Sequence, residues 1–147
     1  MLIMIGQQLQ DDISLLLIRA SLKAKHGLIR IAEEYELNPM QALSLCVLEP
    51  GKSVPMNSLS YPLSCDPLSV TGIVDRLVAM GYATRTESTE DRRIKTISLT
   101  STGVELREKL LRANIGIRMP GLEKLSKNEA DELVRLIVKT TEISLHD

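Results

Sequence analysis

The chain has 147 residues and a formal net charge of −1, with 44% apolar and 25% charged side chains. These values predict one folded domain with a sizeable core, and they exclude a disordered chain and a uniformly basic nucleic-acid coat. The absence of Phe and Trp argues against a protein that stacks single-stranded bases on aromatic rings. The polar opening segment is too short to span a membrane, so we expect a cytoplasmic protein with no membrane partner.

The charge is distributed unevenly along the chain. The first 51 residues carry four basic and six acidic side chains, residues 52–118 carry ten and seven, and residues 119–147 carry four and six. A basic middle between acidic ends indicates that one part meets a polyanion. The signal is weak alone, because differences of this size also occur in enzymes.

A long amphipathic helix is predicted from about Gln8 to Tyr35, where apolar residues recur at steps of three and four. More than about six turns of helix exceed what a small domain needs for its own core. A partner subunit is one way to cover the surplus apolar surface, and packing within the same chain is the alternative.

Two further helices are predicted before the middle of the chain. Asn38 followed by Pro39 is typical of a helix start, because Asn accepts hydrogen bonds at the N-cap and Pro fits the first turn. Ser53 is predicted to cap a short third helix, and Pro62 truncates or kinks it by removing a backbone donor.

A capped helix and a hairpin follow. Asp66 and Pro67 predict the next helix start, and Gly81 predicts its end. The β-branched segments 82–86 and 95–99 predict two short strands joined by a polar tip. A short helix, a longer helix and a hairpin in this order describe a winged helix-turn-helix.

Two capping boxes predict the last helices. Thr102 to Glu105 is expected to open a helix that includes Ile115, and Ser126 to Glu129 is expected to open the final one. The predicted fold class is therefore mainly α (α+β), with long helices at both ends of the chain.

The helix after Asp66 and the hairpin tip suggest duplex DNA as the partner. An α-helix fits the major groove, and side chains near its start contact base edges. The exposed positions predicted there are Leu68, Ser69, Thr71 and Gly72, with Asp75 and Arg76 one turn later. Arg92 and Arg93 at the tip suit phosphates or a minor groove, and Asp91 is placed to hold one arginine. For the tip alone, a solvated turn is the alternative.

Four segments stand in a specific order and spacing: 66–77 with Val-Asp-Arg-Leu, 81–85, 91–93 with Asp-x-Arg, and 97–103 with Leu-Thr-x-x-Gly. Together they resemble the MarR family of transcriptional regulators, and the resemblance covers nearly the whole chain. It implies an obligate homodimer that binds a pseudo-palindromic operator, usually as a repressor, and that a small ligand or oxidation often releases. It also implies one domain over 1–147, with dimerisation helices in 1–35 and 104–147 and a DNA-binding lobe in 38–103.

The resemblance also implies the DNA-contacting positions. Asp91 orients the wing arginine, and Arg92 occupies a variable position. Gly72 stands where many members carry a larger polar or basic side chain, which predicts one contact fewer. The complete predicted set is Ser69, Val70, Thr71, Gly72, Arg76, Asp91, Arg92, Arg93 and Lys95.

Other sites are predicted more weakly. A ligand pocket between the dimerisation helices and the lobe is implied by the resemblance, with His26, Tyr35 and Met40 as candidates and core packing as the alternative. Cys65 precedes a helix start and is a candidate redox sensor, although an ordinary turn residue is the alternative and Asp66 opposes a lowered thiol pKa.

No metal site or cofactor is expected, because neither His has a ligand at metal-binding spacing. An enzyme is disfavoured by the absence of phosphate-loop, nucleophile-elbow and zinc-protease motifs. The other alternative is a winged-helix protein-interaction module with weakened or lost DNA binding.

Overall fold

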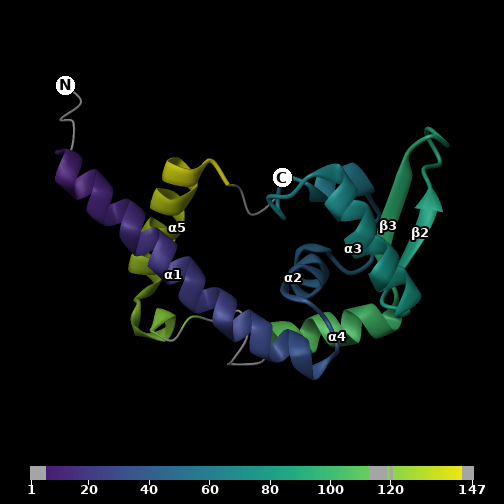
Figure 1. Cartoon of the computed structure of the whole chain (residues 1–147), viewed down its shortest axis with the longest axis horizontal. Coiled ribbons are helices and arrows are strands. Elements are labelled where there is room, and N and C mark those ends of the chain that lie inside the picture. Colours follow the sequence, from purple (N-terminus) through teal and green to yellow (C-terminus); the bar gives the residue numbers. More distant parts are fainter. Residues whose placement is uncertain (1–5, 113–118, 120, 144–147) are drawn as a thin grey trace.

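The computed structural model describes residues 6–112, 119 and 121–143. Figure 1 shows α3 and the β2–β3 hairpin at one end of the molecule, and α5 with the N-terminal part of α1 at the other. The predicted mainly helical winged helix-turn-helix is confirmed. Its elements are α1 (Gln7–Glu34), α2 (Pro39–Val47), β1 (Val54–Pro55), the 3-10 helix η1 (Met56–Leu59), α3 (Pro67–Ala79), β2 (Ala83–Glu87), β3 (Lys95–Leu99), α4 (Ser101–Arg112), the 3-10 helix η2 (Leu122–Lys124) and α5 (Lys127–Thr141).

Local capping explains where α2, α3 and α5 begin. The Asn38 side chain accepts a hydrogen bond from the Gln41 N–H, and the Gln41 side chain accepts one from the Asn38 N–H, both at 2.9 Å. Ser126 forms the same reciprocal box with Glu129. These predicted helix starts are confirmed, and so is the end of α3, where Gly81 has a φ of +78°.

The segment after α2 differs from the prediction. Ser53 caps no helix; Val54 and Pro55 instead form β1, which pairs antiparallel with β3 in a sheet of order β1-β3-β2. The helix that follows is a short 3-10 helix without a side-chain cap at its start. The reason is that two residues of extended backbone here find pairing partners on β3, far along the chain at Thr96 and Ile97.

The start of α4 also requires a correction. The box predicted at Thr102 does not form, because Thr102 already lies inside α4, which begins at Ser101. Thr100 serves as the cap: its hydroxyl accepts from the Gly103 N–H at 3.0 Å and donates to the Gly81 carbonyl oxygen at 2.7 Å. One side chain thereby joins the turn that ends α3 to the start of α4.

The hydrophobic core lies within the lobe. Among the described residues, α1 contributes only its last turns, α5 contributes no buried residue, and α4 contributes two leucines. The end of the predicted dimerisation segment 1–35 and the start of the segment 104–147 therefore pack in the core together with the lobe. The buried apolar residues are Ile31, Ala32, Leu37, Ala42, Leu45, Leu48, Leu59, Leu63, Val70, Ile73, Val74, Leu77, Ala83, Ile97, Leu106 and Leu110.

The helices outside the lobe expose apolar side chains. Leu16 in α1 is 61% exposed, and five apolar residues of α5 are each more than a third exposed. Such a surface is unusual for an isolated soluble chain and marks an interaction site. Ile115, predicted in the helix that begins near Thr102, lies outside the described residues, and so does His146, the second histidine of the sequence. The apolar surface, called the helical patch below, consists of Leu9, Ile13, Leu15, Leu16, Leu17, Ile18, Leu22, Leu133, Val134, Leu136, Ile137 and Val138.

Candidate nucleic-acid interface

The outward face of α3 forms the first part of the interface. Ser69, Thr71 and Gly72 are exposed near its start and Arg76 near its end, as predicted. Val70 is only 1% exposed and packs in the lobe core, so its predicted role as a DNA contact is wrong. The 3.6-residue period turns Val70 inward with the other buried residues of α3.

Hydrogen bonds within the helix occupy the hydroxyl groups at the start of α3. The Asp66 carboxylate accepts from the Ser69 hydroxyl at 2.6 Å and from the Ser69 N–H at 3.0 Å, and these bonds hold the pKa of Asp66 below its ordinary value. The Thr71 hydroxyl donates to the Pro67 carbonyl oxygen at 3.1 Å. Both side chains therefore present acceptor lone pairs, not protons, to a ligand.

The tip of the β2–β3 hairpin carries an oriented arginine. Asp91 accepts hydrogen bonds from Arg93 through Nη2 (3.0 Å), Nε (3.2 Å) and the backbone N–H (3.0 Å). These bonds lower the pKa of Asp91, while the Arg93 side chain stays 91% exposed. The predicted Asp91–Arg93 pair is confirmed. A fixed, exposed guanidinium on a hairpin is suited to contact phosphates.

The remaining wing cations differ in their partners. Arg92 is exposed and forms no ion pair within the described residues. Lys95 on β3 lies 2.7 Å from Glu87 on β2, joining their Nζ and Oε1 atoms. Both side chains of that pair are about half exposed, so the pair is weak in water and phosphate can compete for the ammonium group.

A further ion pair, missed by the sequence analysis, ties α3 to the wing. Asp75, predicted as an outward position of α3, accepts a hydrogen bond from Arg85 on β2. The two residues are ten positions apart, across the turn at Gly81. The sequence shows an acidic and a basic residue on either side of the end of α3. Whether they meet depends on the direction in which the turn at Gly81 sends β2.

An open groove of about 300 Å³ lies between η1, α3 and the wing. It brings predicted residues of α3 and of the wing to one place, together with three that sequence reasoning missed. The two on η1 were missed because the pairing of β1 with β3, not a local pattern, sets η1 beside the wing, and the third is an apolar residue of the wing itself. The missed residues are Met56, Asn57 and Ile94, and the predicted residues at the groove are Thr71, Arg93, Lys95 and the buried Val70.

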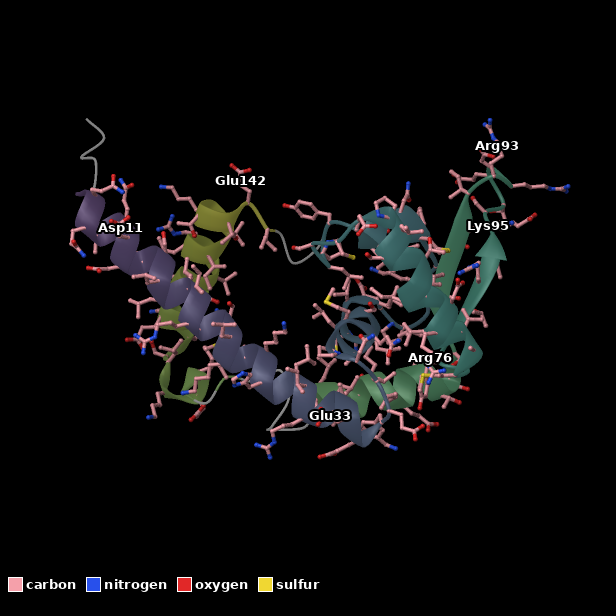
Figure 2. The ribbon with its side chains drawn as sticks, in the orientation of Figure 1. Asp11, Glu33, Arg76, Arg93, Lys95 and Glu142 are labelled. Atoms are coloured by element: carbon pink, nitrogen blue, oxygen red, sulfur yellow. The ribbon has the colours of Figure 1, made fainter. Side chains whose placement is uncertain are left out.

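The predicted cations are spread over the lobe. Figure 2 shows Arg93 and Lys95 toward the free end of the wing and Arg76 well away from them, toward the base of the wing. The structure therefore groups Arg93 and Lys95 with the start of α3 and leaves Arg76 apart.

Comparison with known proteins agrees with this arrangement. A family model described as MarR family matches residues 37–95. The HTH-type transcriptional repressor MdtR of Bacillus subtilis (strain 168) is 26% identical over 142 residues, which cover 97% of this chain and 92% of that protein. Over residues 37–95 the chain therefore matches the MarR family. It is a DNA-binding transcriptional regulator, and these similarities give no support to the interaction-module alternative.

Solved MarR-type structures have the same fold. CouR of Rhodococcus jostii RHA1, bound to p-coumaroyl-CoA, is 25% identical with a TM-score of 0.76 and covers 92% of this chain and 95% of its own. A mutant MarR of E. coli in complex with operator DNA has a TM-score of 0.70 over 88% of this chain and 93% of its own. The latter is 22% identical, which makes it a likeness of fold.

The candidate ligand residues do not form one group. Tyr35 and Met40 are half-buried and pack against the lobe core, as the core-packing alternative expected. His26 is exposed on α1 and is not among the side chains packed with them. Their role in ligand binding stays a prediction.

Both cysteines are half-buried free thiols. Burial raises the pKa of the Cys65 thiol, and the Asp66 carboxylate raises it further. Burial raises the pKa of Cys46 to about 11 against the opposing charge of Arg107. Because the thiolate is the reactive form, these shifts disfavour oxidation at either site.

The described residues offer neither a metal cluster nor a membrane span. Within them, no group of three or more His, Cys, Asp or Glu side chains is placed to hold a metal ion. None of the helices described combines the length and apolarity needed to cross a membrane.

Proposed function

We propose that this protein is a MarR family member, a homodimeric repressor that acts on a pseudo-palindromic operator in duplex DNA, in the cytoplasm, and that it has no catalytic activity. The observation that carries the proposal is the groove shared by the start of α3 and the Arg93-bearing wing. An α-helix fits the major groove, and a cationic hairpin beside it fits the adjacent backbone or minor groove.

The helical patch supports the dimer. Its apolar residues on α1 and α5 add nothing to the lobe core, and a second copy would remove them from water. The acidic ends of the chain would then lie away from the phosphates. In such a dimer the two α3 helices would enter successive major grooves, about 34 Å apart.

A small-molecule effector is the proposed release signal. CouR is bound to p-coumaroyl-CoA, and both thiols of this chain have raised pKa values that disfavour an oxidation signal. A ligand that changes the spacing of the two lobes would shift the dimer between two global states, only one of which fits the operator.

The experiment is fluorescence anisotropy of a labelled duplex from the region upstream of the protein's own gene, compared with a scrambled duplex at two salt concentrations. We expect the first duplex to bind roughly a thousandfold more tightly. Arg93→Ala should weaken binding to both duplexes and lower the salt slope by about one per half-site. The matched control is Arg135→Ala, which removes an exposed arginine of α5.

Equal, weak binding to both duplexes would contradict a sequence-specific operator at this location. An Arg93→Ala variant with wild-type affinity and salt slope would contradict the assigned role of the wing.

A further inference from the structure

Leu68 is a large apolar side chain that the fold leaves in water. It is the second residue of α3, is 82% exposed and is absent from the lobe core. The inward face of α3 is formed by Val70, Ile73, Val74 and Leu77. At 3.6 residues per turn, Leu68 projects from the side of α3 opposite these four.

Gly72, one turn after Leu68, leaves bare backbone on the same outward side. A Cβ built on Gly72 would meet no atom within 4 Å, and the backbone there does not have the positive φ that requires glycine. Glycine inside a helix lowers its stability relative to alanine, and the fold gains nothing from it here. The recognition face therefore combines an apolar projection with an uncovered backbone beside it.

The polar groups next to Leu68 narrow what this face can bind. The hydroxyl protons of Ser69 and Thr71 are donated to Asp66 and Pro67 within the helix. Their oxygens can accept from base amino groups but offer no proton to a base acceptor. An apolar side chain in the major groove has one apolar counterpart, the C5-methyl group of thymine.

From these observations we infer that Leu68 is a specificity-determining residue that contacts a thymine methyl group, and that the bare backbone at Gly72 lets α3 approach that base closely. The inference rests on the proposed function, because it needs α3 in the major groove. Thymine is then the base that α3 prefers opposite Leu68 in each half-site.

The test begins by selecting preferred duplexes from a random pool with the full-length protein. Each thymine of the selected duplex is then replaced by deoxyuridine, which removes only the methyl group. We expect one symmetric pair of positions at which the wild-type protein loses about fourfold in affinity for each half-site. No loss at any thymine would overturn the inference while leaving the proposed function intact.

The Leu68→Ala protein should bind the selected, thymine-containing duplex more weakly than the wild type does. Its affinities for that duplex and for the deoxyuridine-substituted duplex should lie within about twofold of each other. Val78→Ala is the matched control, since Val78 is an exposed apolar residue on the same helix near its other end. It should keep the full thymine preference. Leu68→Ala with an undiminished preference for thymine would overturn the assignment.

Gly72→Ala tests the close approach of α3 to the base separately from the stability of the fold. It should melt at the same temperature as the wild type or higher, yet bind the thymine duplex about threefold more weakly or worse. Unchanged affinity would overturn the part assigned to Gly72. Failure to select any duplex at all would overturn the proposed function, and the inference with it.

Discussion

At the scale of single residues, two glycines of the lobe have opposite surroundings. A Cβ on Gly103 would lie 1.9 Å from the carbonyl oxygen of Tyr82, whereas one on Gly72 would lie in open space. We expect Gly103→Ala to lower the free energy of unfolding by about 3 kcal/mol, because α4 must move away from the Tyr82 backbone, which lies just before β2. Gly72→Ala should raise it by about 1 kcal/mol. Urea denaturation measures both, and similar effects of the two substitutions would contradict this contrast.

Asp66 makes the recognition helix sensitive to acid. Its pKa is lowered from 3.8, first by the Ser69 hydroxyl and then by the backbone N–H. A lowered folded-state pKa contributes stability that is present above pH 3.8 and is lost as pH falls through the lower folded value. Asp66→Asn keeps an N-cap acceptor without a titrating group.

We therefore expect the melting temperature of the wild type to fall more steeply than that of Asp66→Asn below about pH 4. Above that pH the melting temperatures of the two proteins should change in parallel, because Asp66 stays ionised. Identical melting curves across the acid range would show that Asp66 does not contribute through ionisation.

At the scale of elements, the contact between α3 and β2 aligns the recognition helix with the wing. Arg85 and Asp75 form its ion pair, with side chains 32% and 57% exposed. Ion pairs exposed to this degree contribute little to the free energy of unfolding. A double-mutant cycle with Asp75→Ala and Arg85→Ala should therefore give a coupling energy of about 0.5 kcal/mol. The coupling should shrink in high salt, since the pair is accessible to ions. A coupling of zero in low salt would remove this pair as a link between the elements.

At the scale of the whole molecule, the helical patch and the recognition face lie on different parts of the chain (Figure 1). Leu16→Glu places a charge in the proposed dimer interface, so we expect it to sediment as a monomer and to lose operator affinity. Leu68→Glu places the same charge on another exposed leucine and should remain a dimer. Analytical ultracentrifugation distinguishes the two, and a dimeric Leu16→Glu protein would contradict this use of the patch.

Val70 shows where resemblance and local pattern disagreed. In the sequence, Val70 stands at helical spacing from Ile73, Val74 and Leu77, which is typical of a buried stripe, whereas the family resemblance placed it among the DNA contacts. The structure buries it. A resemblance transfers a position along the chain, but the direction of a side chain follows from the helical period, so the periodicity was the better guide here.

The sequence by itself determined the features that depend on neighbours along the chain. The helix starts at Asn38, Asp66 and Ser126, the turn at Gly81 and the Asp91 support of its arginine each involve groups a few residues apart. The hydrogen bonds concerned are short-range, so residue type and spacing were sufficient to predict them.

Only the tertiary structure decided the features that join distant segments. Val54 becomes a strand because it meets Ile97, Thr100 caps α4 while bonded to Gly81, and η1 forms one wall of the groove beside the wing. These contacts form only once the lobe core has packed, and no local spacing encodes which segments it brings together.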